Sequence, residues 1–281
     1  MCIRDSNSAS GVDAEKHGML NFPSVGIQGG YAMFSVRLNK IDDFINAGLL
    51  PTDAFNDSSC KAYYKFEAGF EDSTGIANAT VFNGGTAGNS SEIGSNAFLG
   101  DNDSGFYSPS SASPLISDMP TGSNAWAVSM WFKIAPGTTT NCSFFHGSRG
   151  NDHDRPGAWL RRIDGSNYRI EYFSSSNGVS WNVCKGDVAT GTDARGNLNA
   201  ITLDTWHHWV WQRTSAGLYN AWVDGHKDFH YADNTNLHSS GAYSFNWGNW
   251  FHSTTNYGFV GNLDNVRFFN RSLSELSLIH I

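Results

Sequence analysis

The chain has 281 residues, of which 16% are charged and 14% are aromatic, and its formal net charge is −8. The charged fraction is well below the roughly 25% of ordinary soluble domains, and the excess of acid argues against a nucleic-acid partner, because phosphates are bound by lysine and arginine. No apolar run is long enough to insert into a bilayer, and the length suits one large β domain with a shorter flanking region.

The two ends of the chain, residues 1–6 and 276–281, are expected to be foreign to the protein. The first segment can be encoded by a DNA sequence whose reverse complement encodes the last segment. This inverted identity resembles the mosaic end of a sequencing-library transposon, translated at both edges of an assembled fragment. We therefore expect the natural protein to continue past both ends, with its flanking domains and any targeting segment lost there.

Residues 7–59 are expected to be a connector. Residues 7–30 are polar and glycine-rich without periodicity, as linkers are. In residues 38–51, LNKIDDFINAGLLP, apolar side chains recur at helical spacing, and a glycine followed by a proline supplies a helix stop. The sequence predicts a short docking helix at this position.

From Cys60 onward the sequence predicts short strands separated by clusters of Gly, Asn, Asp and Ser. The clearest strand is residues 125–134, AWAVSMWFKI. Large apolar side chains occupy one face of this strand, and Trp131 lies on the other face among smaller or polar side chains. Together the strands predict an antiparallel sandwich over residues 60–275. The other predicted strands are KAYYKFEA, CSFFHG, AWLRRI, NYRIEYFS, VSWNVC, HHWVWQR, LYNAWVDG, AYSFNWG and GNLDNVRFFN.

Residues 205–225, TWHHWVWQRTSAGLYNAWVDG, are predicted to form a β-hairpin that turns at TSAG. Adjacent residues of a strand point to opposite faces, so His207 and His208 cannot chelate one metal ion together. One face of the hairpin must pack into the core, and the other either lies under a loop or lines a groove. We interpret His208 and the neighbouring tryptophans mainly as packing residues.

Three cysteines lie outside the foreign ends: Cys60, Cys142 and Cys184. None of them has CxxC spacing, which argues against a cysteine zinc site. Their spacing leaves two alternatives open, a disulfide between Cys142 and Cys184 or buried thiols that act as small apolar side chains.

Three motifs follow one another in the β region: AYYKFEAGFEDSTG, LDTWHHWVWQRTSAGLYNAWVDG and GFVGNLDNVRFFNRSLSE. In this order, residues 60–275 resemble the laminin-G-like domains of the concanavalin A-like lectin and glucanase superfamily. The resemblance implies an all-β fold, a two-sheet antiparallel β-sandwich of the concanavalin A-like jelly-roll type. It implies less about function, because this fold carries many binding proteins and some enzymes.

Aromatic side chains opposite the core are the candidates for carbohydrate binding. Trp131 points away from the core side of its strand, and Trp222 does the same in the second strand of the hairpin. Exposed rings stack on the apolar faces of sugars, and neighbouring polar side chains such as Asn220 and Arg155 bind hydroxyl groups. The alternative is that a loop covers both rings.

Related jelly rolls often hold a structural calcium ion where the first and last strands meet, and the resemblance implies Asp264, Glu67 and Asp72 as its ligands. The alternative for Asp264 is a hydrogen bond within a turn. The loop of residues 146–157, HGSRGNDHDRPG, collects further histidines and acids, but spacing within an irregular loop defines no ligand geometry.

Glucanases of this superfamily carry paired acids on one strand, and no predicted strand shows that pattern, since Glu171 stands alone in its strand. We therefore expect no catalysis, and predict a non-catalytic module that binds a glycan or another cell-surface ligand, outside the cell or on its surface, with calcium as a structural ion. Three alternatives stay open: a receptor-binding module of a viral tail fibre on a virion, a structural or protein-binding spacer, and a glycan-cleaving enzyme with an unrecognised acid pair.

Overall fold

The computed structural model describes fourteen stretches of the chain, and the chain divides into two compact units, Met1–Thr52 and Asp53–Ile281. No helix long and apolar enough to cross a membrane occurs among the described residues. The described residues are 17–22, 32–37, 58–76, 78–101, 103–108, 121–136, 138, 142–146, 156–164, 167–184, 196, 201–238, 245–249 and 258–274.

In the first unit, β1 (His17–Phe22) pairs with β2 (Ala32–Arg37) in antiparallel register. The sequence analysis expected a linker where β1 lies. Strand pairing here depends on backbone hydrogen bonds, which leave no periodic pattern of side chains in a short segment. The helix predicted over residues 38–51 lies outside the described residues.

The second unit is all-β in its described part, and its strands form two antiparallel sheets. The strands of the first sheet are β3 (Cys60–Tyr64), β5 (Thr86–Gly88), β6 (Ala97–Asp101), β8 (Trp126–Ile134), β12 (Trp206–Arg213), β13 (Leu218–Val223), β14 (His226–Ala232) and β16 (Val260–Phe269). The strands of the second are β4 (Thr80–Phe82), β7 (Gly105–Tyr107), β9 (Cys142–His146), β10 (Gly157–Asp164), β11 (Asn167–Phe173) and β15 (Asn246–Trp247).

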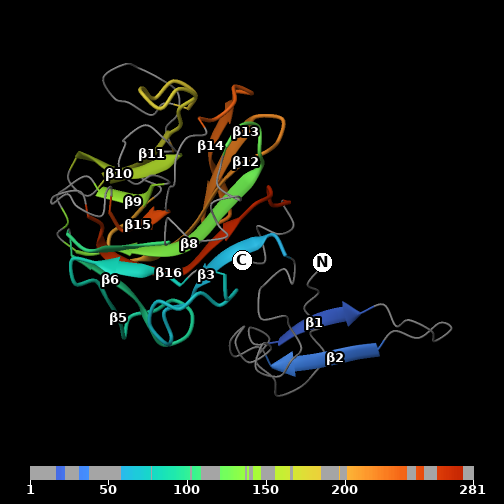
Figure 1. The fold of residues 1–281 in the computed structure, drawn as a ribbon. Coiled ribbons are helices and arrows are strands. Elements are labelled where there is room, and N and C mark those ends of the chain that lie inside the picture. The colour runs from blue at the N-terminus through green and yellow to red at the C-terminus, as the bar shows by residue number, and fades with distance from the viewer. Residues whose placement is uncertain are drawn as a thin grey trace. The chain divides into compact units, whose positions relative to one another are not determined.

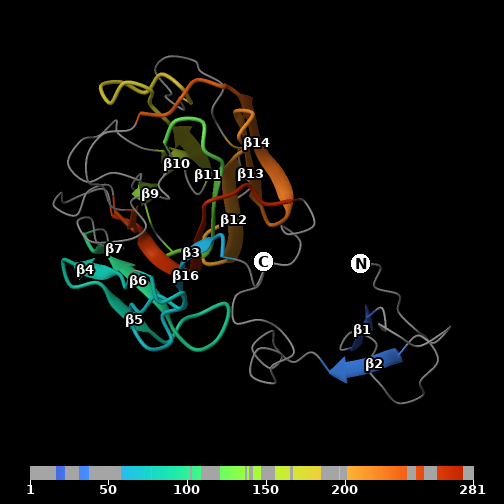
Figure 2. The same cartoon turned by 45° about the vertical axis from the view of Figure 1, so that its right-hand side comes forward.

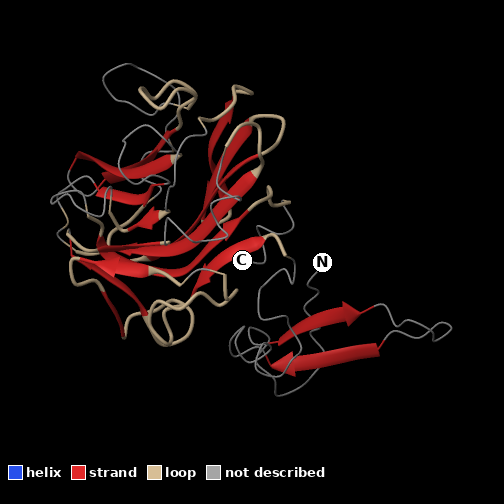
Figure 3. Cartoon of the chain, viewed as in Figure 1, coloured by secondary structure: helices blue, strands red, loops and turns tan. Residues whose placement is uncertain are grey.

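The larger sheet has eight strands, in the order β14-β13-β12-β8-β16-β6-β5, with β3 paired to β16 beside β6. The smaller sheet has six, in the order β11-β10-β9-β15-β7-β4. Figure 1 shows β8 and β12 as long, curved strands with β9, β10 and β11 on their inner side, and the turned view of Figure 2 shows the same two layers. Coloured by secondary structure, both layers consist of strands joined by loops (Figure 3). The predicted jelly-roll sandwich is confirmed.

One hydrophobic core fills the space between the two sheets. Its largest members are tryptophans, and the rings of Trp126 and Trp211 meet edge to face with centroids 4.7 Å apart. Tyr172 of β11 stacks on Phe229 of β14 at 4.5 Å, which joins the six-stranded to the eight-stranded sheet. Such aromatic pairs stabilise a fold beyond the area that they bury. In the strand predicted over residues 125–134, one set of alternate side chains therefore faces this core, and the other set faces outward.

Not every predicted strand forms. The segment VSWNVC belongs to a turn-rich loop, in which Ser175 Oγ accepts hydrogen bonds from the backbone N–H groups of Asn177 and Gly178. Asn177 Oδ1 accepts two more, from Val179 and Ser180. Side chains that bond their own backbone compete with the sheet ladder, and here the loop wins. The short strands β4 to β7 and the strand β14 were not predicted.

The three cysteines of the second unit are free thiols and all are buried. Of the two alternatives for Cys142 and Cys184, the structure therefore has buried thiols. Burial raises the pKa of the Cys142 thiol to about 12, so this group stays protonated and unreactive in the folded protein.

Candidate functional site

The outward face of the eight-stranded sheet carries the predicted tryptophans. In the strand register, Asp264 of β16 lies opposite Trp131 of β8, which in turn lies opposite His208 of β12. Trp222 of β13 lies opposite Val210, two residues further along β12 on the same face. Trp131 and Trp222 are both partly exposed. The two rings therefore stand on either side of β12 on one face.

His208 lies beside Trp131. Its ring lies 5.0 Å from that of Trp131, and its Nε2 forms a 2.9 Å hydrogen bond with Ser129 Oγ. Burial, reinforced by the nearby Arg267 guanidinium, lowers the pKa of His208 to about 4. His208 is therefore neutral at physiological pH, and the face around Trp131 presents an uncharged imidazole. The packing role predicted for His208 agrees with these contacts.

Asn220 lies on the same face, in β13, the strand next to the one that carries His208. It pairs with Gln212 on one side and with His230 on the other, and its Oδ1 accepts a 2.8 Å hydrogen bond from His230 Nδ1. The residue is only 9% exposed. Arg155, the other polar residue predicted for sugar binding, lies outside the described residues.

Part of this face is covered by the segment that follows β16. The backbone N–H of Leu273 donates a 2.6 Å hydrogen bond to Gln212 Oε1. Around Leu273 a small apolar cluster forms on the outward face, and Trp222 packs against it. The members of this outer cluster are Cys60, Tyr63, Ala127, Val210, Phe269 and Leu273. The structure thus combines the two predicted alternatives, since a covering segment is present but both indole rings keep an exposed part.

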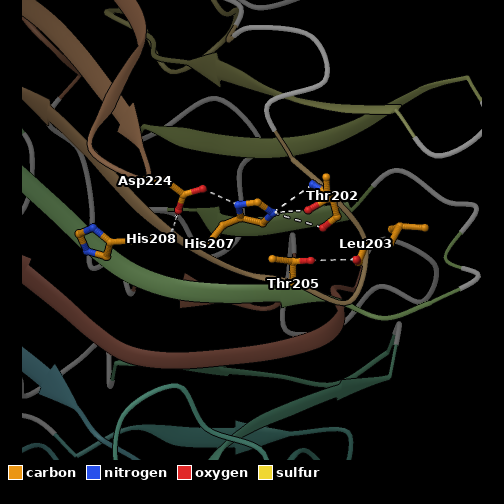
Figure 4. A network of polar contacts seen from close by, with 6 residues as sticks. All are labelled: Thr202, Leu203, Thr205, His207, His208 and Asp224. Carbon is orange, nitrogen blue, oxygen red and sulfur yellow. Dashed lines mark hydrogen bonds and ion pairs between the residues drawn. The ribbon is translucent and has the colours of Figure 1, made fainter. Parts of the chain in front are cut away.

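The other histidine of the pair points toward the opposite side of β12. His207 Nδ1 donates to Asp224 Oδ2 at 2.6 Å, and His207 Nε2 accepts from the backbone N–H of Thr202 at 3.0 Å (Figure 4). The backbone N–H of His208 donates to the second oxygen of Asp224. His207 therefore ties the segment before β12 to the turn between β13 and β14. The prediction that the two histidines do not share a metal ion is consistent with this geometry.

The three predicted calcium ligands are occupied by hydrogen bonds to different extents. Asp264 Oδ2 accepts from the backbone N–H groups of Glu92 and Ile93, and its Oδ1 accepts from the backbone and side-chain N–H groups of Asn265. These bonds use all four lone-pair positions of the carboxylate. Despite them, burial raises the pKa of Asp264 to about 6. A calcium ion at Asp264 would have to displace one of these donors.

Asp72 and Glu67 also anchor backbone. Asp72 accepts from the N–H groups of Tyr63, Thr74 and Ile76 and from the hydroxyl of Thr74. Glu67 Oε1 accepts from the N–H groups of Ser95 and Asn96. Within the described part of the chain, no three His, Cys, Asp or Glu side chains gather as metal ligands. The predicted acids therefore lie at the meeting of the first and last strands, where they hold loops.

The outward face of the six-stranded sheet contains a second cluster, which the sequence analysis did not identify. Trp159 and Arg161 of β10 lie opposite Glu171 and Arg169 of β11. Arg169 Nη2 contacts Glu171 Oε1 at 2.8 Å, and Arg161 Nε lies 3.3 Å from Glu171 Oε2. One carboxylate thus serves two guanidinium groups.

Aromatic rings extend this second cluster along the sheet. The rings of Trp159 and Phe173 are 6.2 Å apart, and Trp181 lies 5.4 Å from Phe173 and 6.2 Å from His146. The signal in the sequence is alternation within AWLRRI and NYRIEYFS, where every second residue is aromatic or charged. Both strands follow from the sequence, but the register that places their outward side chains opposite one another does not.

The fold and both outward faces belong to a two-sheet jelly roll. Residues 101–278, more than half of the chain, match the Laminin_G_3 family of the concanavalin A-like lectin/glucanases superfamily, and the chain belongs to this family. The predicted resemblance is confirmed. Among curated proteins, none matches the chain significantly.

Solved structures with the same fold are distant in sequence. Domain 4 of AbnA, an extracellular GH43 arabinanase from Geobacillus stearothermophilus, solved with arabinotriose, aligns with a TM-score of 0.54 and 18% identity over 78% of this chain and 96% of that domain. The binding domain of botulinum neurotoxin DC aligns with a TM-score of 0.52 and 11% identity in a complex with SialylT, over 79% of this chain and 50% of that one. The same binding domain in complex with rat synaptotagmin II gives a TM-score of 0.51 and 10% identity over 78% and 50%. The chain spans about half the length of these neurotoxin domains.

Proposed function

We propose that the jelly-roll domain is a non-catalytic carbohydrate-binding module that works outside the cell or on its surface. The observation that carries the proposal is the placement of Trp131 and Trp222, two partly exposed indole rings on one sheet face. Between them lies His208, which burial keeps neutral, and beside them lies the Asn220 amide. Indole rings stack on the apolar faces of sugars while neutral polar groups bind hydroxyls.

Two similar domains support a saccharide ligand. One was solved with arabinotriose and the other with SialylT. The alternative of a protein ligand has its own support, because the neurotoxin domain was also solved with rat synaptotagmin II. The two partly exposed indole rings on this face favour the saccharide.

The described acids favour binding over catalysis. Glu171 is 1% exposed and contacts two arginines, so its carboxylate is not accessible to a substrate. The carboxylates of Asp72 and Asp264 are each occupied by four hydrogen bonds. A glycosidase needs two carboxyl groups roughly 5–10 Å apart that both reach the substrate.

The test is a glycan-array screen followed by calorimetry with the best ligand. Trp131→Ala and Trp222→Ala should each weaken binding about tenfold, since each removes one stacking ring. Val179→Ser, which changes an exposed apolar side chain on a loop of the other sheet, is the control and should bind normally. The proposal fails if both tryptophan variants, with unchanged melting temperatures, bind as the parent does.

The structural calcium ion expected from the sequence needs a separate test. The saturated carboxylates of Asp72 and Asp264 do not fit a calcium ligand set, and Glu67 is the predicted ligand whose Oε2 carries no hydrogen bond in the described part of the chain. A fall in melting temperature with EDTA, reversed by added calcium, would support the ion. An unchanged melting temperature is what the hydrogen bonds imply.

A further inference from the structure

The outward face of the eight-stranded sheet carries a third partly exposed indole, that of Trp206 at the start of β12. Trp206 precedes His208 by two residues, so both side chains leave the strand on the same side. In the strand register, Trp206 lies opposite Lys133 of β8, and His208 lies opposite Trp131. The indole of Trp206 therefore lies on the same face as those of Trp131 and Trp222.

Two charged side chains lie beside the ring of Trp206. Lys133 Nζ is 5.5 Å from the ring centroid, and this cation–π contact orients the indole. Within the described part of the chain, Lys133 is the only charged or aromatic side chain that contacts this ring. Asp204, in the turn before β12, has its Oδ1 3.8 Å from the same Nζ, and its side chain is 62% exposed. An ammonium group donates hydrogen bonds and a carboxylate accepts them, so the two together suit the hydroxyl groups of a sugar.

The three indoles lie at successive levels along the strands. Trp222 of β13 lies opposite Val210, which follows Trp206 by four residues on β12. Four residues of strand and one step between strands place the Cα atoms of Trp206 and Trp222 about 14 Å apart. Trp131, on the other neighbour of β12, lies at the level of His208, between these two. A single sugar ring is too small to reach all three indoles, whereas a chain of several sugar units can reach them.

We propose that Trp206, Lys133 and Asp204 form a further subsite of this face, and that the face takes an extended chain of sugar units rather than a single terminal sugar. Trp206 stacks on one unit, and Lys133 and Asp204 bind hydroxyl groups of that unit. Trp131 and Trp222 stack on units further along the chain. The inference rests on the proposed carbohydrate-binding function and adds to it the length of the ligand and a third point of contact.

The experiment is calorimetry on the full chain with oligosaccharides of two and five units, prepared from arabinan, xylan and cellulose. In at least one of these series, the five-unit sugar should bind about tenfold more tightly than the two-unit sugar, since it stacks on a further ring. Trp206→Ala should remove this gain for the five-unit sugar. The same variant should leave the two-unit sugar unaffected, because that sugar binds equally well at Trp131.

Matched variants guard against a loss of folding. Asp204 has a φ of 53°, a conformation that asparagine also tolerates, so Asp204→Asn removes the charge without straining the turn. It should weaken binding of the five-unit sugar about threefold and leave the two-unit sugar unchanged. Trp181→Ala removes a partly exposed indole outside this face and should change the affinity for neither sugar.

The outcomes separate this inference from the proposed function. The inference is overturned if Trp206→Ala and Asp204→Asn, with the parent's melting temperature, both bind the five-unit sugar as the parent does. It is also overturned if no five-unit sugar binds more tightly than its two-unit counterpart. If binding is then still weakened in Trp131→Ala and Trp222→Ala, the proposed function stands and only the extended site fails. If those two variants bind normally, the proposed function fails as well.

Discussion

The outward faces of the two sheets carry different polar groups beside their aromatic rings. On the eight-stranded sheet, Trp131 and Trp222 are accompanied by a neutral histidine, an amide and the buried side chains of Asp264 and Arg267, and Leu273 covers part of the face. On the six-stranded sheet, Glu171 and two arginines make a charged cluster beside aromatic rings.

This difference shows how one sandwich can offer two kinds of surface. Strand alternation sends every second side chain outward from both sheets, so the fold itself decides only where the outward positions lie. What each face recognises depends on whether its polar groups are neutral or ionised. Neutral groups suit hydroxyls, and ionised groups suit ligands of opposite charge.

The largest effect is expected from breaking the ionic cluster. Glu171→Gln should lower the free energy of unfolding by about 3 kcal/mol, because it leaves the mostly buried Arg169 without its anion. Urea denaturation measures this loss. The exposed Glu71→Gln is the matched control and should cost less than about 0.5 kcal/mol.

Replacing both members of the buried ion pair tests the same stability effect in a second way. The double variant Glu171→Leu with Arg169→Leu should recover most of the loss, since apolar side chains of similar volume often substitute for a buried ion pair. A single Glu171→Gln variant as stable as the parent would show that the cluster contributes no stability.

On the eight-stranded sheet, we expect pH to have two opposing effects on the free energy of unfolding. His208 has a folded pKa of about 4 against the ordinary 6.5, so its contribution to stability falls by about 3 kcal/mol as pH drops through this window. Asp264 has a folded pKa of about 6 against the ordinary 3.8, so its contribution rises by about 3 kcal/mol as pH drops from 6 to 4. The two nearly cancel in the parent protein.

Single variants should expose each effect in urea denaturation between pH 4 and pH 7. His208→Gln removes the acid-sensitive group, and its stability relative to the parent should increase as the pH falls. Asp264→Asn should show the reverse slope. The comparison uses slopes because each substitution also removes hydrogen bonds. Two variants with the parent's pH profile would contradict both assignments.

The smallest effect is expected from the covering segment. Leu273→Ala should cost about 2 kcal/mol, at the low end for a buried leucine, because the outer cluster lies at the edge of the domain. Hydrogen exchange at residues 270–274 should accelerate in this variant, since the backbone bond to Gln212 loses its apolar cover. Unchanged exchange would mean that this hydrogen bond alone holds the segment.

The fold was predictable from local pattern because its long strands alternate strictly. In Trp126–Ile134 the inward residues are those that the pattern assigned to the core, whereas in Trp206–Arg213 both faces are apolar and the pattern left open which of them packs inward. Strands of three residues, such as Thr80–Phe82, span too little chain to show a period. The segment VSWNVC has strand-forming residues, but side chains of the preceding serines and asparagine bond the backbone of the loop.

The candidate sites were predictable only in part. Which face Trp131 and Trp222 occupy follows from alternation within their own strands. That Leu273 covers part of this face, or that Arg161 meets Glu171 across a hairpin, depends on register and on contacts between distant segments. The acids Asp264 and Glu67 stand out in the sequence, but their backbone partners at residues 92–96 have no signature there.

The buried thiols have a practical consequence for following the motions of the domain. Cys60 lies in the eight-stranded sheet and Cys142 in the six-stranded sheet, and neither is exposed in the folded state. Cys60 belongs to the outer cluster and Cys142 to the core between the sheets, so a thiol-reactive dye can label Cys60 when the outer cluster opens and Cys142 only when the core opens. Single-cysteine versions of the domain would report these two opening rates separately, without any added label site.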